Sequence, residues 1–127
     1  MLEKTTHVPI LVSDQDKALD FYVGKLGFEK RNDYALKNKP RWLTVALPGA
    51  AQEFALVKGE FLIDPRSEEG YQFTLTTSDC RGEVTKLKAR GVSLREPAPV
   101  EIPLGILASF QDPDGNRFNL LQPSRGR

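Results

Sequence analysis

The sequence predicts an α+β fold made of two successive β-α-β-β-β modules. Three observations predict it: β-branched apolar runs of strand length, amphipathic stripes with helical spacing, and turn signals repeated at a nearly constant offset. The pairs Ser13-Asp14 and Ser78-Asp79 are 65 residues apart, and so are the turn residues Pro48 and Pro113. Matching turn signals in the same element order indicate two copies of one unit.

The first module is expected over about residues 5–58. A β-branched run at residues 5–12 predicts a buried strand, and Ser13 with Asp16 has the spacing of a helix capping box. The helix that follows carries an apolar stripe and ends at Gly27, as helices commonly end at glycine. Three further strands are predicted at residues 28–32, 41–47 and 52–57, with a turn at Pro48-Gly49.

The second module is expected over about residues 70–122. A strand at 71–77 precedes Ser78-Asp79 and a helix whose apolar stripe is Cys80, Val84 and Leu87. Strands are predicted at 92–94, 105–111 and 116–122, with a tight turn at residues 112–115. Residues 59–70 are expected to form a linker or an exposed edge. The proline-rich stretch 96–103 is expected to be an irregular loop.

Composition narrows the classes of function. The 127 residues hold 18 Lys and Arg against 17 Asp and Glu, a formal net charge of +1, so neither nucleic acid nor an anionic membrane is an expected partner. No apolar run approaches the length of a membrane span, and the first residues do not resemble a signal peptide. The one cysteine, Cys80, fits a reducing compartment. These features predict a cytoplasmic protein.

The chain contains one histidine, His7. Chemistry that needs two histidines from one chain is therefore excluded. This single count limits the metal sites that the sequence can build.

Strand alternation separates a bulky apolar face, which should pack under the helices, from a mixed face. Each mixed face carries one polar residue near the start of its strand: His7, Glu53, Gln72 and Asn119. If the two modules face each other, these four side chains converge in a concave sheet, which is the usual shape of a small-molecule site. The alternative is four unrelated polar residues on a solvated sheet.

Two segments carry a family resemblance: HVPILVSDQDKALDFYVGKLGFE at residues 7–29 and FQDPDGNRFNLLQ at residues 110–122. They resemble the glyoxalase/bleomycin resistance/dioxygenase group, the vicinal oxygen chelate (VOC) superfamily, and the resemblance covers both modules. It implies one VOC domain over residues 1–127, with the two modules forming a cupped, mixed half-barrel sheet. It also implies a homodimer with a small-molecule site near the subunit interface.

The resemblance implies a role for the four polar positions, because metal-using relatives have one metal ligand at each of them. His7 and Glu53 keep the usual residue types, whereas Gln72 stands where most relatives have histidine and Asn119 where they have glutamate. One imidazole, one carboxylate and two amides would hold Ni²⁺, Mn²⁺, Mg²⁺ or Zn²⁺ only weakly, so a loosely bound divalent ion and no cofactor at all both stay open. Relatives that rely on two histidines, such as extradiol dioxygenases, are excluded as models.

Two main functions follow from the resemblance. In the first, the protein is a glyoxalase-type lyase or isomerase whose metal site is weakened or lost, with Glu53 as the catalytic base and His7 and Glu53 as metal ligands. In the second, it is a metal-free protein that binds or sequesters a small molecule such as an antibiotic. The ligand would then contact Trp42, Gln72, Thr74, Thr76 and Asn119. A third, weaker possibility is a degenerate member used mainly for dimerisation.

Overall fold

The computed structural model describes residues 1–37, 39–59 and 72–124, and every structural statement below concerns these residues. The chain divides into two compact units, residues 1–62 and 63–127, and each is described by itself. The predicted linker at 59–70 lies outside the described residues except for Gly59.

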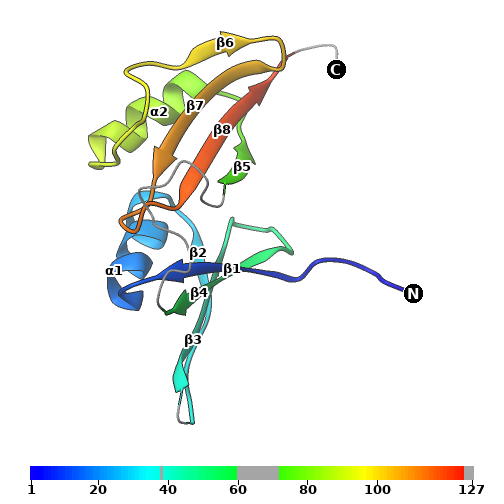
Figure 1. The fold of residues 1–127 in the computed structure, drawn as a ribbon. Helices are drawn as coiled ribbons and strands as arrows, with labels where there is room; N and C mark the ends of the chain where they lie inside the picture. The colour runs from blue at the N-terminus through cyan, green and yellow to red at the C-terminus, as the bar shows by residue number, and fades with distance from the viewer. Residues whose placement is uncertain (38, 60–71, 125–127) are drawn as a thin grey trace. The chain divides into compact units, whose positions relative to one another are not determined.

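Unit 1 is a four-stranded sheet covered by one helical segment (Figure 1). In chain order its elements are β1 (His7–Val12), α1 (Gln15–Leu19), the π-helical segment η1 (Asp20–Lys25), β2 (Glu29–Leu36), β3 (Lys39–Ala46) and β4 (Glu53–Lys58). The strand order is β1-β4-β3-β2, with β1 and β4 parallel and the other pairs antiparallel. The β-α-β-β-β order predicted for this half is confirmed.

Unit 2 repeats this topology with the order β5-β8-β7-β6. Its elements are β5 (Gln72–Thr76), α2 (Cys80–Ala89), β6 (Val100–Ile102), β7 (Gly105–Gln111) and β8 (Arg117–Pro123). The parallel pair is β5 with β8, which corresponds to β1 with β4. The α+β class and its two-module construction are therefore both confirmed.

Each helix begins at the aspartate of a Ser-Asp pair. The carboxylate of Asp14 accepts a hydrogen bond from the Lys17 backbone N–H at 3.0 Å, and that of Asp79 accepts one from Gly82 N–H at 3.0 Å. The predicted capping box at Ser13 and Asp16 is wrong, because Asp14 has the extended backbone of an N-cap and its carboxylate supplies the cap. The Lys17 N–H bond stabilises the ionised carboxylate and so lowers the pKa of Asp14.

The strand predicted at residues 92–94 is wrong, since Leu94 forms only an isolated bridge to Phe110. The missing strand is β6, which lies inside the proline-rich stretch that was expected to be a loop. β6 pairs with β7 alone and forms an edge of its sheet. Proline is tolerated at sheet edges, where an N–H is not needed on the open side.

The buried faces of both sheets agree with the alternation in the sequence. In unit 1, Ile10, Val12 and Leu56 are almost fully buried, and Tyr22 of η1 contacts Phe28 edge to face with ring centroids 5.6 Å apart. In unit 2, Phe110 and Phe118 stack at 5.3 Å. These cores fix the strands, and the opposite sheet faces carry the polar residues.

Cys80 lies at the first turn of α2, and burial raises the pKa of its thiol. Few thiolates then form at pH 8, and the buried sulfur is shielded from reagents. We expect Cys80 in the folded protein to react with Ellman's reagent roughly 100-fold more slowly than in 6 M guanidinium, because reaction requires local opening. Equal rates in the two conditions would contradict the buried position of this thiol.

No helix within the described residues is long and apolar enough to cross a membrane.

Candidate functional site

His7 and Glu53 meet on the mixed face of the unit 1 sheet. The parallel register of β1 and β4 places them directly opposite each other, with His7 Nε2 3.4 Å from Glu53 Oε1. The Glu53 side chain is 19% exposed and the His7 side chain 39% exposed. Both groups are therefore within reach of a ligand from solvent.

The Glu53 carboxylate has two more partners that the sequence analysis missed. Asn32 Nδ2 donates to Glu53 Oε1 at 3.3 Å and also contacts Thr44 Oγ1 at 3.0 Å. Arg31 Nη1 lies 3.8 Å from Glu53 Oε2. Glu53 is thus held by an imidazole, an amide and a guanidinium.

A β-bulge explains how two consecutive residues reach one carboxylate. Lys30 pairs with Val45 and Asn32 with Thr44, so Arg31 is an extra residue opposite no single partner. Successive side chains of a regular strand point to opposite faces, but a bulge re-aims them. No feature of the sequence marked this bulge, which is why Arg31 was not recognised.

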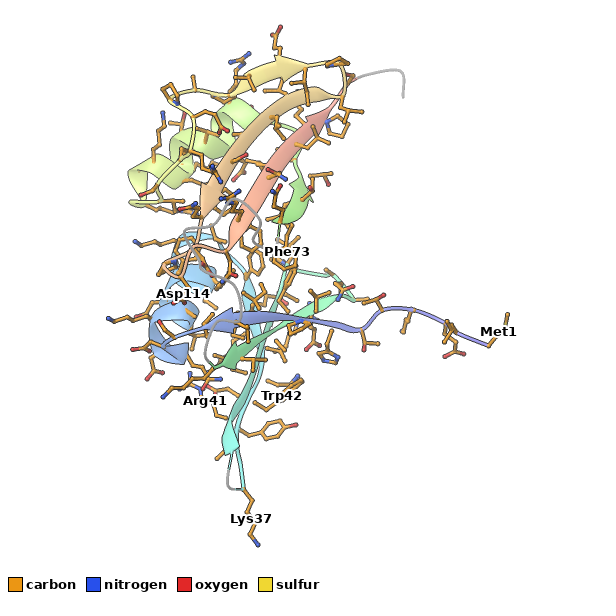
Figure 2. The ribbon with its side chains drawn as sticks, viewed as in Figure 1. Met1, Lys37, Arg41, Trp42, Phe73 and Asp114 are labelled. Carbon is orange, nitrogen blue, oxygen red and sulfur yellow. The ribbon has the colours of Figure 1, made fainter. Side chains whose placement is uncertain are left out.

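Trp42 supplies an aromatic surface beside this pair. Its ring centroid is 5.6 Å from that of His7, and the two rings are tilted by 55°. Figure 2 shows Trp42 and Arg41, which are consecutive in β3, projecting to opposite sides of the strand. Tyr34 lies opposite Trp42 in the β2–β3 register and is exposed, so the face offers two aromatic rings to solvent.

In unit 2, Asn119 contacts both Gln72 and Ser109. Asn119 Nδ2 lies 3.4 Å from Gln72 Oε1, and the Ser109 hydroxyl lies 3.0 Å from Asn119 Oδ1. This hydrogen-bonded row is electrically neutral. The side-chain amide of Asn119 donates a hydrogen bond to Gln72 and accepts one from Ser109.

The register in unit 2 differs from that in unit 1. Thr74 lies opposite Asn119, and Gln72 lies opposite Arg117. Arg117 is buried, and the sequence analysis did not place it near the candidate site. Thr74 and Thr76 are exposed on the same face of β5 as Gln72. The structure thus brings the predicted residues together pairwise within each unit. Convergence of all four into one site stays a prediction.

The donor groups do not fit a tight metal centre. Among residues 1–37, 39–59 and 72–124, no group of three or more His, Cys, Asp or Glu side chains is placed to hold a metal ion. Glu53 is already contacted by Arg31, Asn32 and His7, and a cationic guanidinium beside a carboxylate opposes binding of a dication. Gln72 and Asn119 could offer only neutral amide oxygens, which are weak ligands.

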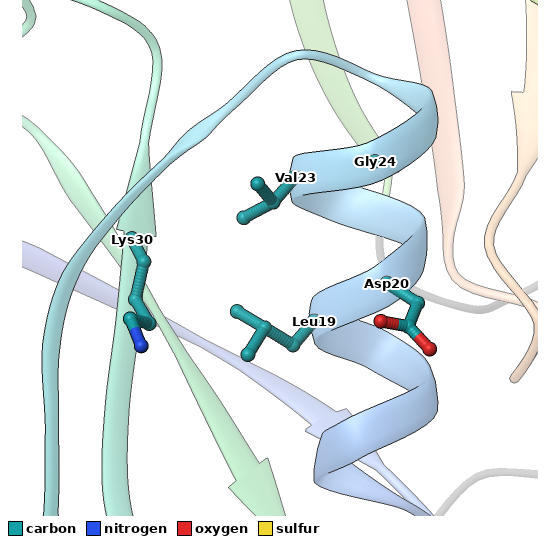
Figure 3. A pocket seen from close by; sticks show the side chains of 5 residues that line it. All are labelled: Leu19, Asp20, Val23, Gly24 and Lys30. Carbon is teal, nitrogen blue, oxygen red and sulfur yellow. The ribbon is translucent and has the colours of Figure 1, made fainter.

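A separate hollow of about 290 Å³ lies on the helix-covered side of unit 1 (Figure 3). Leu19 and Val23 project from the helical segment toward Lys30 of β2. Asp20 and Gly24 complete the lining. None of the predicted site residues lines this hollow, so it is not the candidate site.

Comparisons with known proteins agree with this fold. The family model described as "Glyoxalase/Bleomycin resistance protein/Dioxygenase superfamily" matches residues 4–120. The crystal structure of UcmS2 is 33% identical with a TM-score of 0.85, and covers 96% of this chain and 99% of its own. TnmS3, described as an antibiotic binding protein from Streptomyces sp. CB03234, is 35% identical with a TM-score of 0.81, over 97% of this chain and 98% of its own.

A curated relative, the uncharacterized protein YetH of Bacillus subtilis strain 168, is 30% identical over 94% of this chain and 98% of its own length. Both the family model and these relatives span nearly the whole sequence. The chain therefore belongs to the glyoxalase/bleomycin resistance protein/dioxygenase superfamily, as its two modules and its terminal motifs indicated.

Proposed function

We propose that this protein binds a small molecule without a metal, in the manner of an antibiotic-binding protein, and acts as a homodimer. The observation that carries the proposal is the hydrogen-bonded row Gln72–Asn119–Ser109. Two of these residues occupy family metal positions, and both are neutral amides committed to each other. The similarity to TnmS3 supports the same class of function.

Each unit by itself offers groups for contact with such a ligand: aromatic rings in unit 1 and neutral hydrogen-bonding groups in unit 2. Trp42 and Tyr34 offer ring faces for stacking on a planar apolar group, and stacked aromatic pairs contribute about 0.5–1.5 kcal/mol beyond their buried area. Gln72, Asn119 and the exposed hydroxyls of Thr74 and Thr76 offer neutral donors and acceptors for carbonyl or hydroxyl groups. Neutral polar groups set in an apolar wall orient a ligand without reacting with it.

The competing function is a glyoxalase-type lyase or isomerase. The His7–Glu53 pair favours it, because a carboxylate 3.4 Å from an imidazole resembles an acid–base pair. Glu53 is, however, also contacted by Arg31 and Asn32. Both carboxylate oxygens are thus already in contact with a donor, which leaves less room for a substrate proton.

Calorimetric titration tests the proposal. We expect chloramphenicol, an uncharged aromatic antibiotic used as a probe, to bind in the presence of EDTA with the same affinity as after addition of Ni²⁺. Asn119→Leu or Trp42→Ala should weaken binding by roughly tenfold, the effect of losing about 1.4 kcal/mol. Thr85→Ala, on the exposed side of α2, is the matched control and should leave the affinity unchanged.

The enzymatic alternative is assayed in parallel with methylglyoxal, glutathione and added Ni²⁺ or Mn²⁺. Turnover that disappears in Glu53→Gln would overturn the binding proposal and establish the lyase. Light scattering after size-exclusion chromatography tests the homodimer, and a monomer at micromolar concentration would contradict it.

A further inference from the structure

We infer that Arg31 is a specificity-determining residue of the site: it offsets the charge of Glu53, so that the His7–Trp42 face of unit 1 binds a cationic ligand less tightly than it would without this guanidinium. The choice of an aromatic small molecule as the ligand rests on the proposed function. The charge balance itself concerns unit 1 alone and is tested without any ligand.

The guanidinium of Arg31 is fixed by contacts on several sides. Arg31 Nη2 donates to the carbonyl oxygens of Ala50 at 2.9 Å and Leu47 at 3.3 Å, and Arg31 Nε contacts Glu29 Oε2 at 3.1 Å. These bonds tie the β2 bulge to the turn between β3 and β4. Because the side chain is already ordered, little further entropy is lost in holding Nη1 beside Glu53.

The guanidinium offsets part of the negative charge on this face. Glu53 and Glu29, which both contact Arg31, carry two negative charges against its one positive charge, while Asn32 and Thr44 are neutral. Trp42 contacts the His7 ring, and His7 contacts Glu53, so Trp42 lies close to these charges on the scale of the Debye length, about 10 Å at 0.1 M salt.

Without Arg31, the same face would present the carboxylates of Glu53 and Glu29 with no guanidinium against them, beside two aromatic rings. Such a combination attracts cations, both through charge and through the ring faces. The bulge therefore places a cation where a regular strand would leave Glu53 available to a cationic drug. Lys30, one residue earlier in β2, lies on the opposite face and lines the hollow with Leu19 and Val23.

Collisional quenching of tryptophan fluorescence measures the local charge directly, because Trp42 is the chain's one tryptophan. The quenchers are iodide, caesium and uncharged acrylamide at constant ionic strength. Relative to the wild type, we expect Arg31→Gln to raise the ratio of caesium to iodide quenching about threefold. Glu53→Gln should lower the ratio by a similar factor, and the double variant should return it to the wild-type value.

Three controls separate charge from structure. Lys30→Gln removes the same charge from the other face of the same strand and should leave the ratio unchanged. Arg31→Lys keeps the charge and should also keep the ratio. Acrylamide quenching and circular dichroism should be the same in all variants, which shows that the exposure of Trp42 and the fold are preserved.

The ligand arm uses bleomycin as a cationic probe and chloramphenicol as an uncharged one. Arg31→Gln should gain at least about threefold in bleomycin affinity, with chloramphenicol affinity unchanged. A quenching ratio in Arg31→Gln equal to that of Lys30→Gln, or a double variant that does not return to the wild-type ratio, would overturn the inference. Failure of every variant to bind either probe, with the quenching pattern intact, counts against the proposed function and not against the charge balance.

Discussion

Replacing Phe118 with alanine lowers the free energy of unfolding by about 3–5 kcal/mol, the range for removing a fully buried aromatic side chain. Phe118 is completely buried in β8. It stacks on Phe110 with the ring planes 8° apart and contacts Phe73 at 5.3 Å. The three rings come from β5, β7 and β8, so the cavity opens where these strands share one core. Urea unfolding followed by circular dichroism measures the loss.

Leu121→Ala is the comparison for this variant. Leu121 lies on the other face of the same strand and is only half-buried, so its truncation should cost about 1 kcal/mol. Domains of this size have total stabilities of about 5–15 kcal/mol, so the Phe118 variant loses a large share and the Leu121 variant a small one. Similar losses in the two variants would mean that the apolar face of β8 is not the one packed against α2.

The sequence was most informative where backbone geometry alone decides the outcome. Side chains alternate between faces in every strand, so the period-two pattern placed His7 and Glu53 on one face and Ile10 and Leu56 on the other. The Ser-Asp pairs marked where both helices begin and the glycines where they end, because these signals also depend on local backbone geometry. Gly27 and Gly91 both have φ of +83°, a conformation that glycine adopts without strain.

Features that depend on pairing between strands were not predictable. The constant offset of about 65 residues suggested that Gln72 and Asn119 would pair as His7 and Glu53 do. The β5–β8 register instead sets Asn119 against Thr74 and Gln72 against Arg117. A register shift of two residues leaves every side chain on the same face, so the alternation of apolar and polar residues is unchanged. The spacing of residues in the sequence therefore does not determine the register.

The bulge at Arg31 shows the same limit at the site. From the sequence, the consecutive residues Arg31 and Asn32 are expected to point to opposite faces of a strand. Only the pairing of β2 with β3 shows that both reach Glu53. β6 was missed for a different reason. Its neighbours Pro97, Pro99 and Pro103 are strong loop signals, and only its edge position makes a strand compatible with them.

Replacing Asp112 with alanine should lower the free energy of unfolding by about 3 kcal/mol, since several buried donors lose their acceptor at once. The Asp112 carboxylate accepts from the backbone N–H of Asp114 at 2.9 Å, from that of Asn116 at 2.8 Å, and from Asn116 Nδ2 at 2.8 Å. Asp112 and Asn116 are both buried. Water cannot easily replace a lost acceptor there, so the donors stay unsatisfied.

This turn also controls the candidate site, because it joins β7 to β8 and sets Ser109 opposite Asn119. In Asp112→Ala we therefore expect faster amide hydrogen exchange along β7 and β8, and weaker chloramphenicol binding, at a urea concentration far below the unfolding midpoint.

Pro113→Ala is the matched control, since Pro113 is exposed in the same turn and its replacement should lower the free energy of unfolding by less than about 1 kcal/mol. Asp112→Asn should fall between the two. Its amide oxygen can still accept the backbone N–H bonds, while its NH₂ group would face that of Asn116. A loss in Asp112→Ala no larger than in Pro113→Ala would mean that the strand pair, and not the aspartate, holds the turn.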